Sequence, residues 1–414
     1  MALSRVIQMS LLGLAARAWG GDGDQARLMK EFKGAALVDV SRDERLILTR
    51  SRKRIQCDDG KRNCLTDFLT VYDNSTGKPI GVLVSPNLPS FFLPNRYLVP
   101  EFSPQGEVRV IELSGKSGNT VRLTWNPLTG SQRSDLFPFP KGFSYRCPIE
   151  DGRLLGTGER SKLLQVLEQG SLSPETIAVL ADPPFEYQGK FNCRGWRSGP
   201  DFLLQDEKPD RSPREDHFGK RLTWFSTTPG VPARPCRTFE NQRIHGYTIS
   251  PDASRVAVIT SPLIKLGNRS YLTILDRADC RELNRFELDF PERAGLKAPL
   301  LFPSRTSPDN VPFREQFARL IAVSPDNTKL SVAYGISKGR SGVAFFGVYS
   351  MTDGRRLATL KGDTYTPIFC DAYQWDIYSA PDAPIYGALQ FSLDSKSLYT
   401  SSEKIRQWDL SNLR

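Results

Sequence analysis

The chain offers few of the side chains that carry acid–base or metal chemistry. Only two of its 414 residues are histidines, His217 and His245, which excludes a multi-histidine metal centre. His217 lies in a charged run, whereas His245 begins a predicted innermost strand, where a hydrogen-bonded structural role is expected. No Gly-x-Ser-x-Gly elbow supports a serine triad, and no glycine-rich phosphate loop opens a helix. We therefore assign no catalytic, metal-binding or cofactor-binding residue.

Clustered cations make the segment Arg50 to Asp67 the first candidate binding site. Guanidinium groups bind phosphate, sulfate and carboxylate oxygens in pairs, so such a cluster suits a protein or an anionic polymer. The alternative is a solvated loop, since three acids, Asp58, Asp59 and Asp67, lie in the same stretch. The candidate residues are Arg52, Lys53, Arg54, Lys61 and Arg62.

A second distinctive segment, Asp363 to Tyr386, contains acids and aromatic residues but no Lys or Arg. Aromatic residues beside acids can form a protein hot spot or a platform for carbohydrate. They can equally form the segment's own small core, or this acidic segment can pair with the basic one. The candidate binding residues are Tyr365, Tyr373, Trp375 and Tyr378.

Four copies of one short phrase indicate the elements that position these segments. Each copy follows an apolar run and leads, after a few mostly polar residues, into a second run, which is typical of a β-hairpin. Repetition along the chain predicts a radial β-architecture, because one sheet buries its faces only against the next. The copies are Val40-Ser41-Arg42-Asp43, Ile249-Ser250-Pro251-Asp252, Val323-Ser324-Pro325-Asp326 and Phe391-Ser392-Leu393-Asp394.

A third strand is expected after each hairpin, because alternating apolar residues there usually run into Gly, Asn or Pro. Seven such strands predict seven blades, although the apolar run Val108 to Leu113 in blade two has no place in this scheme. The third strands are predicted at 68–72, 121–125, 163–167, 221–225, 271–275, 344–349 and 404–408.

The ends of the chain predict how the ring closes. The last blade has only three strands of its own, and residues 25–33 resemble the fourth strand of the preceding blade, 354–361. The N-terminal segment is therefore expected to supply the missing edge strand and complete the last blade. We predict one propeller domain over residues 21–414, all-β, with four antiparallel strands in each of seven blades.

The Ser-Pro-Asp turns and the final Trp408-Asp409 resemble a degenerate WD-repeat or related bacterial seven-bladed β-propeller over residues 25–414. The Gly-His signature before each inner strand is missing, and Trp-Asp ends a third strand only once. The resemblance therefore implies the scaffold and no ligand.

The cysteines and the N-terminus favour an oxidising compartment. Residues 1–20 read as a signal peptide, with Arg5 before an apolar run and a small-x-small site at Ala16-Arg17-Ala18; a buried first helix is the alternative. Seven cysteines allow three bridges and one free thiol, with Cys57–Cys64 and then Cys147–Cys193 as the preferred pairs. Cys236 and Cys280 are further candidates, without an assigned pairing.

The predicted insertions gather at one end of the blades, which we name the long-loop face. They are Arg50 to Asp67, Gln205 to Lys220, Asp289 to Gln316 and Lys361 to Ile385. The formal net charge of +10 suits anionic partners but is too dispersed to favour nucleic acid.

We expect a secreted or periplasmic, monomeric, non-enzymatic scaffold, without a transmembrane span, that binds a protein or anionic polymer on this face. The alternative is a propeller lactonase, glycosidase or quinone-type dehydrogenase with its site at the channel mouth.

Overall fold

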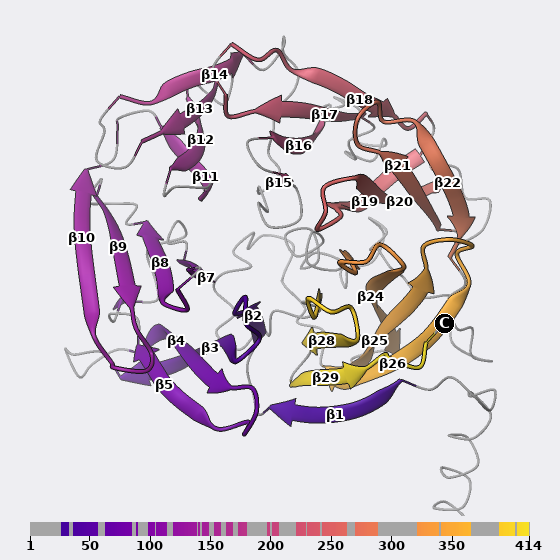
Figure 1. Cartoon of the computed structure of the whole chain (residues 1–414). Coiled ribbons are helices and arrows are strands. Elements are labelled where there is room, and N and C mark those ends of the chain that lie inside the picture. The colour runs from indigo at the N-terminus through magenta and orange to yellow at the C-terminus, as the bar shows by residue number, and fades with distance from the viewer. Residues whose placement is uncertain are drawn as a thin grey trace, which may run out of the picture.

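Seven antiparallel sheets stand side by side in a ring, so the chain folds as a seven-bladed β-propeller (Figure 1). The structure is a computed structural model, and it describes residues 26–32, 36–56, 63–84, 88–89, 98–103, 105–113, 119–138, 140, 143–148, 153–158, 163–168, 173–179, 197–198, 201–206, 221–228, 230–240, 242–262, 270–288, 321–338, 341–365, 389–401 and 404–413. Over these ranges the regular structure consists of strands, without a helix. The predicted all-β class and blade number are confirmed.

Blades one to six pair their strands in chain order from the ring centre outward, and β6 of blade one pairs with β4 beside this order. The strands of blades one to three are β2 (Ala36–Val40), β3 (Leu46–Gln56), β4 (Asn63–Asp73), β5 (Pro79–Val84) and β6 (Leu88–Pro89); β7 (Leu98–Phe102), β8 (Val108–Leu113), β9 (Asn119–Trp125) and β10 (Gln132–Pro138); and β11 (Ser144–Pro148), β12 (Leu154–Gly158), β13 (Leu163–Leu167) and β14 (Glu175–Val179). The strands of blades four to six are β15 (Arg197–Ser198), β16 (Asp201–Asp206), β17 (Arg221–Ser226) and β18 (Arg234–Thr238); β19 (Gln242–Ile249), β20 (Arg255–Pro262), β21 (Tyr271–Asp276) and β22 (Glu282–Glu287); and β23 (Ile321–Val323), β24 (Lys329–Lys338), β25 (Ser341–Ser350) and β26 (Arg356–Tyr365).

Blade seven is completed by the N-terminal strand, as predicted. Its strands β27 (Leu389–Phe391), β28 (Ser397–Ser401) and β29 (Ile405–Asp409) are followed on the outside by β1 (Arg27–Phe32). β1 runs antiparallel to β29, from Arg27 opposite Asp409 to Phe32 opposite Ile405. Figure 1 shows the indigo β1 lying along the yellow β29, so the two ends of the chain close the ring.

All seven predicted third strands are present as β4, β9, β13, β17, β21, β25 and β29. The unplaced apolar run Val108 to Leu113 is β8, the second strand of blade two, which pairs with β7 and β9. Its inner neighbour β7 carries Pro100 and is weakly apolar in pattern, which hid the hairpin.

The segment Arg50 to Asp67, predicted as a loop, is largely strand. β3 and β4 stay paired far beyond the rest of blade one, with Arg52 opposite Asp67 and Gln56 opposite Asn63. The ladder to β2 ends at Arg50, and the ladder to β5 ends at Phe68. Residues 51–56 and 63–67 therefore form a two-stranded extension, which we name the basic ribbon; β6 pairs with it at Cys64 and Leu65.

The hydrophobic core lies between neighbouring blades rather than within one sheet, as a radial arrangement requires. At the closure between blades seven and one, Phe32 packs with Leu37, Ile47, Tyr399 and Ile405, all buried. Between blades five and six a larger cluster is made in the same way. Each blade is thus stabilised by its neighbours.

In the described part of the chain, no helix is long and apolar enough to cross a membrane.

Candidate functional site

The repeated Ser-x-Asp phrase builds the turn between the first and second strands of four blades. In each copy the serine Oγ donates to the aspartate Oδ1, at 2.6 to 2.7 Å, and accepts the backbone N–H five residues after the serine, at 2.8 to 2.9 Å. The aspartate in turn accepts a backbone N–H two residues on. The phrase is therefore explained by local hydrogen bonding, which fixes the hairpin.

A fifth copy lies in blade two and escapes the sequence pattern. Ser103 Oγ accepts the N–H groups of Gln105 and Glu107, at 3.3 and 3.2 Å, and Gln105 stands where the other copies have aspartate. The residue three after the serine has a positive φ in all five turns: Gly106 at 80° and Glu44, Ala253, Asn327 and Ser395 at 57–61°. Only glycine adopts this conformation freely, so the other four turns depend on the serine and aspartate bonds.

These turns also bind one another across blade boundaries. Asn327 Nδ2 donates to Asp252 Oδ2 at 2.6 Å, which joins blades six and five. The N–H of Asp326 donates to Ser395 Oγ at 3.0 Å, and the N–H of Leu393 donates to Glu44 Oε1. A chain of hydrogen bonds thus links blades five, six, seven and one on this end of the ring, which we name the turn rim.

Hydrogen bonding depresses the pKa of the turn aspartates. At Asp252, burial opposes ionisation, but donors from Ser250, Ser254 and Asn327 outweigh it and hold the pKa at about 2. The Ser41 hydroxyl similarly lowers the pKa of Asp43, and the Ser392 hydroxyl lowers that of Asp394. Carboxylates held in this way are ionised structural acceptors rather than general acids at neutral pH.

A groove of about 270 Å³ opens on the turn rim where blades seven and one meet. The Lys30 ammonium at its edge donates to the carbonyls of Asn74 and Ser75, which ties β1 to blade one. Beneath it, the buried Tyr399 hydroxyl accepts from Asn74 Nδ2 at 2.8 Å and from Gln407 Nε2 at 3.1 Å. The groove is lined by Met29, Lys30, Glu44, Arg45, Asp73, Asn74, Ser75 and Gln407.

Burial raises the pKa of Tyr399 to about 12, despite the Asn74 hydrogen bond. The phenol therefore stays protonated at neutral pH. Since Lys30 and Tyr399 are both engaged in joining the two blades, the groove has the chemistry of a structural seam.

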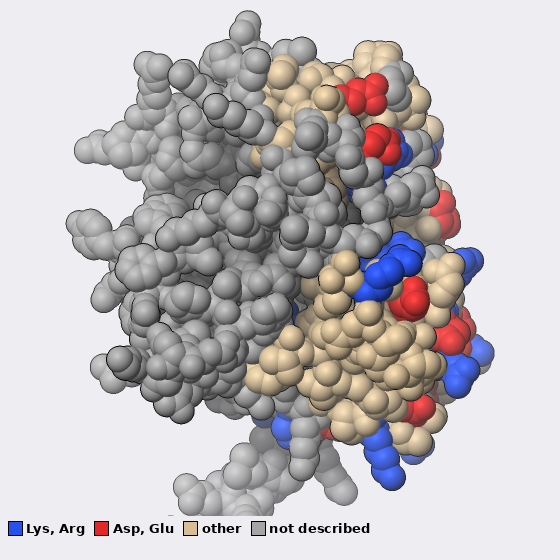
Figure 2. Space-filling model, turned by 90° about the vertical axis from the view of Figure 1, so that its left-hand side faces the viewer, with Lys and Arg blue, Asp and Glu red and all other residues tan. Residues whose placement is uncertain are grey.

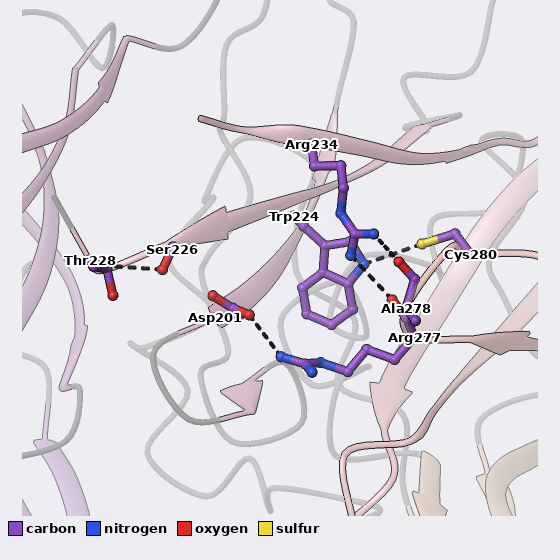
Figure 3. Close-up of polar contacts among 8 residues, drawn as sticks. All are labelled: Asp201, Trp224, Ser226, Thr228, Arg234, Arg277, Ala278 and Cys280. Atoms are coloured by element: carbon purple, nitrogen blue, oxygen red, sulfur yellow. Dashed lines mark hydrogen bonds and ion pairs between the residues drawn. The ribbon is translucent and has the colours of Figure 1, made fainter. Parts of the chain in front are cut away.

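A third polar cluster joins blades four and five (Figure 3). Arg277 binds Asp201 at 2.7 Å, and its guanidinium lies over the Trp224 ring, 5.4 Å from the centroid. The indole N–H of Trp224 donates to Cys280 Sγ at 3.2 Å, and Arg234 donates to the carbonyls of Ala278 and Arg277. Figure 3 shows these side chains converging from both blades on the indole.

Cys236 and Cys280 form a disulfide at this joint, with the two Sγ atoms 2.05 Å apart. Cys236 lies on β18 and Cys280 precedes β22, so the bridge spans the two blades. Both were candidates, but the sequence did not pair them, because their proximity arises only when blades four and five pack. The two preferred pairs are not tested by the structure. Cys57 and Cys193 lie outside the described residues, and the side chains of Cys64 and Cys147 are not described.

Of the predicted partner-binding residues, the structure places only positions 52–54 and 365, and their backbone lies at the opposite end of the blades from the turn rim. Arg52, Lys53 and Arg54 lie on β3 within the basic ribbon, but the structure does not describe their side chains. Lys61 and Arg62 lie outside the described residues. Tyr365 ends β26, the outer strand of blade six, whereas Tyr373, Trp375 and Tyr378 lie outside the described residues. Pairing of the acidic segment with the basic one stays a prediction.

In Figure 2, the Lys, Arg, Asp and Glu side chains of the described residues lie along the right-hand side of the view.

Among the residues that the structure describes, no three His, Cys, Asp or Glu side chains converge as metal ligands. Of the two histidines, His245 lies on β19 and His217 is outside the described ranges.

The sequence matches no protein-family model and no curated protein. Among solved structures, an oligogalacturonate lyase in complex with manganese has a TM-score of 0.51 at 12% identity, covering 95% of this chain and 98% of that one. The Kuenenia stuttgartiensis hydrazine synthase has a TM-score of 0.45 at 11% identity, covering 93% and 98%. A putative 6-phosphogluconolactonase from Bacteroides uniformis has a TM-score of 0.37 at 15% identity, covering 86% and 88%.

At such identities the likeness to the lyase shows the propeller fold alone, and scores below 0.5 support nothing further. The WD-repeat resemblance is thus confirmed only at the level of the seven-bladed fold.

Proposed function

We propose that this protein is a secreted or periplasmic, non-enzymatic scaffold that binds a protein or an anionic polymer through its long-loop face. The observation that carries the proposal is the basic ribbon, in which β3 and β4 continue as a paired extension beyond the four-stranded part of blade one. A paired ribbon holds its cations at fixed spacing, so it loses less conformational entropy on binding than a solvated loop does.

Strand geometry divides the cations of the ribbon between two faces. Successive positions of a strand alternate, so positions 50, 52 and 54 share one face and position 53 takes the other. In the ladder, Asp67 is directly opposite Arg52, whereas Leu65 is opposite Arg54. An excess of positive charge on one face favours a partner with regularly spaced anionic groups.

The turn rim has the opposite character. Its aspartates accept hydrogen bonds from their own turns, and Asp252 also accepts one from blade six, so they are engaged before any ligand arrives. Function is therefore better placed at the other end of the blades, where the longer connections lie.

Two observations support the proposal that the protein is exported. The Cys236–Cys280 disulfide fits an oxidising compartment, and residues 1–20 have the pattern of a signal peptide. We propose that the mature protein is a monomer, since closure by β1 completes the ring within one chain.

The test replaces Arg52, Lys53 and Arg54 together with serine and measures retention on heparin at two salt concentrations. A matched control replaces three exposed cations of the turn rim, Arg42, Arg281 and Lys396, with serine, so that the same formal charge is removed. We expect the ribbon variant to elute at lower salt than the control, with the larger difference at low ionic strength, because exposed charges act through screened attraction. Equal retention of both variants would refute a role for the ribbon.

A further inference from the structure

The outer strand of blade one, β5, exposes a row of aliphatic side chains. Ile80, Val82 and Val84 are 36%, 53% and 49% exposed. The ladder between β5 and β4 is regular from Gly81 to Val84 and shifts register at Ile80. Its other face is buried, with Leu83 6% exposed and packed among blade-two residues. Where the ladder is regular, Val82 and Val84 share the exposed face, and Ile80 extends the exposed row toward the start of the strand.

No other outer strand in the described residues lacks a charged residue. Exposed charges stand on each of them: Arg27 on β1, Arg133 on β10, Glu175 on β14, Arg234 on β18, Glu287 on β22 and Lys361 on β26. Charges on edge strands prevent edge-to-edge pairing with other chains. β5, with the sequence Pro-Ile-Gly-Val-Leu-Val, has none of this protection.

The packing on both sides of blade one explains why the row is uncovered. Toward blade two, Gly81 allows a close approach, since a Cβ there would lie 2.7 Å from the Trp125 ring. Toward blade seven, blade one is contacted through β4 and not through β5: the Phe32 ring of β1 meets the Tyr72 ring of β4 edge-on, with 5.9 Å between the ring centroids. Beyond Tyr72 the face of β5 is exposed.

Two cations mark the turn end of this strand. Lys78, which is exposed, directly precedes β5, and Lys30 lies across the closure on the carbonyls of Asn74 and Ser75. The nearby Asp73 carboxylate is engaged by Ser75 and Thr76, whose hydrogen bonds hold its pKa at about 2. A negative group in a partner would be favoured at this end.

We propose that β5 is a docking edge for an extended polypeptide segment, which adds to blade one as a further antiparallel strand. The segment has aliphatic residues at alternate positions, matching the exposed row, and a carboxylate at its C-terminal end beside Lys78. Main-chain hydrogen bonds to β5, which is the last strand of its sheet among the described residues, supply affinity, and the alternating side chains supply specificity. This site goes beyond the basic ribbon and does not depend on it.

The experiment uses a fluorescein-labelled probe, acetyl-Ser-Val-Thr-Val-Thr-Val-Asp-Asp-amide, whose binding to the full chain is followed by anisotropy. We expect the double variant Val82→Ser, Val84→Ser to bind at least about tenfold more weakly, because two valines lose their apolar contact. The matched control is Leu283→Ser, which removes an aliphatic residue that is 42% exposed on β22; it should bind within about twofold of the unaltered chain. Lys78→Glu should reverse the preference in favour of a probe ending in two lysines.

Equal affinity of the unaltered chain and the double variant would overturn the proposal. So would a concentration-dependent dimer, seen by sedimentation and abolished in the double variant, if the probe does not bind: the occupant would then be a second copy. Heparin retention of the double variant separates this result from the proposed function, since that retention depends on the ribbon.

Discussion

Replacing Phe32 with alanine tests the closure of the ring at a single side chain. The Phe32 ring is 2% exposed and packs with Leu37, Ile47, Tyr399 and Ile405, so its removal leaves a cavity between blades seven and one. Truncating a buried phenylalanine costs about 3–5 kcal/mol, and the lost edge-on contact with Tyr72 is included in that range. Urea denaturation followed by far-ultraviolet circular dichroism measures the change in the free energy of unfolding.

The matched control is Leu28→Ala on the same strand, where the side chain is 44% exposed. Its cost should stay within about 0.5 to 1 kcal/mol, because little apolar area is lost. Deleting residues 21–33 should cost at least as much as Phe32→Ala, because the ladder between β1 and β29 is lost as well. Equal stability of the Phe32 and Leu28 variants would refute closure by β1.

Three further predictions concern the disulfides and the turns. Replacing Cys236 and Cys280 with serine should cost about 4 kcal/mol on the chain-entropy model for their separation of 44 residues, measured by urea denaturation without reductant; a loss below about 1 kcal/mol would contradict it. Cys57 and Cys64 should appear as one linked peptide when unreduced exported protein is digested and mapped by mass; two free thiols would defeat the pairing. For Asp252, the folded-state pKa of about 2 lies below the ordinary 3.8, so its stabilisation is present above about pH 4 and is lost as the pH falls to about 2. Asp252→Asn should therefore flatten the stability profile in acid, and an unchanged slope would count against the Ser-Asp account.

The strands with apolar alternation were predictable from the sequence because their pattern has the period of a half-buried strand. Leu163–Leu167 matches the predicted bounds of a third strand, and the repeated Ser-x-Asp turns located the hairpins that precede such strands. The fifth turn, at Ser103, was missed because Gln105 replaces the aspartate that defines the pattern.

The basic ribbon and the Cys236–Cys280 disulfide are two features that could not be predicted from the sequence. Residues 51–56 carry cations where a strand usually alternates apolar and polar residues, so the sequence predicts a loop there and not a strand paired with β4. The Cys236–Cys280 bridge depends on the packing of two blades, which no local pattern encodes. The exposed row on β5 was also missed, because the sequence did not show which face of that strand blade two covers.

Hydrogen exchange measured with and without bound heparin tests most directly whether the protein binds through its long-loop face. We predict that protection increases in the ribbon strands, over residues 51–56 and 63–67, while the turns at Ser250, Ser324 and Ser392 on the turn rim exchange as in the free protein. Increased protection at those turns, with the ribbon unchanged, would contradict the proposed function.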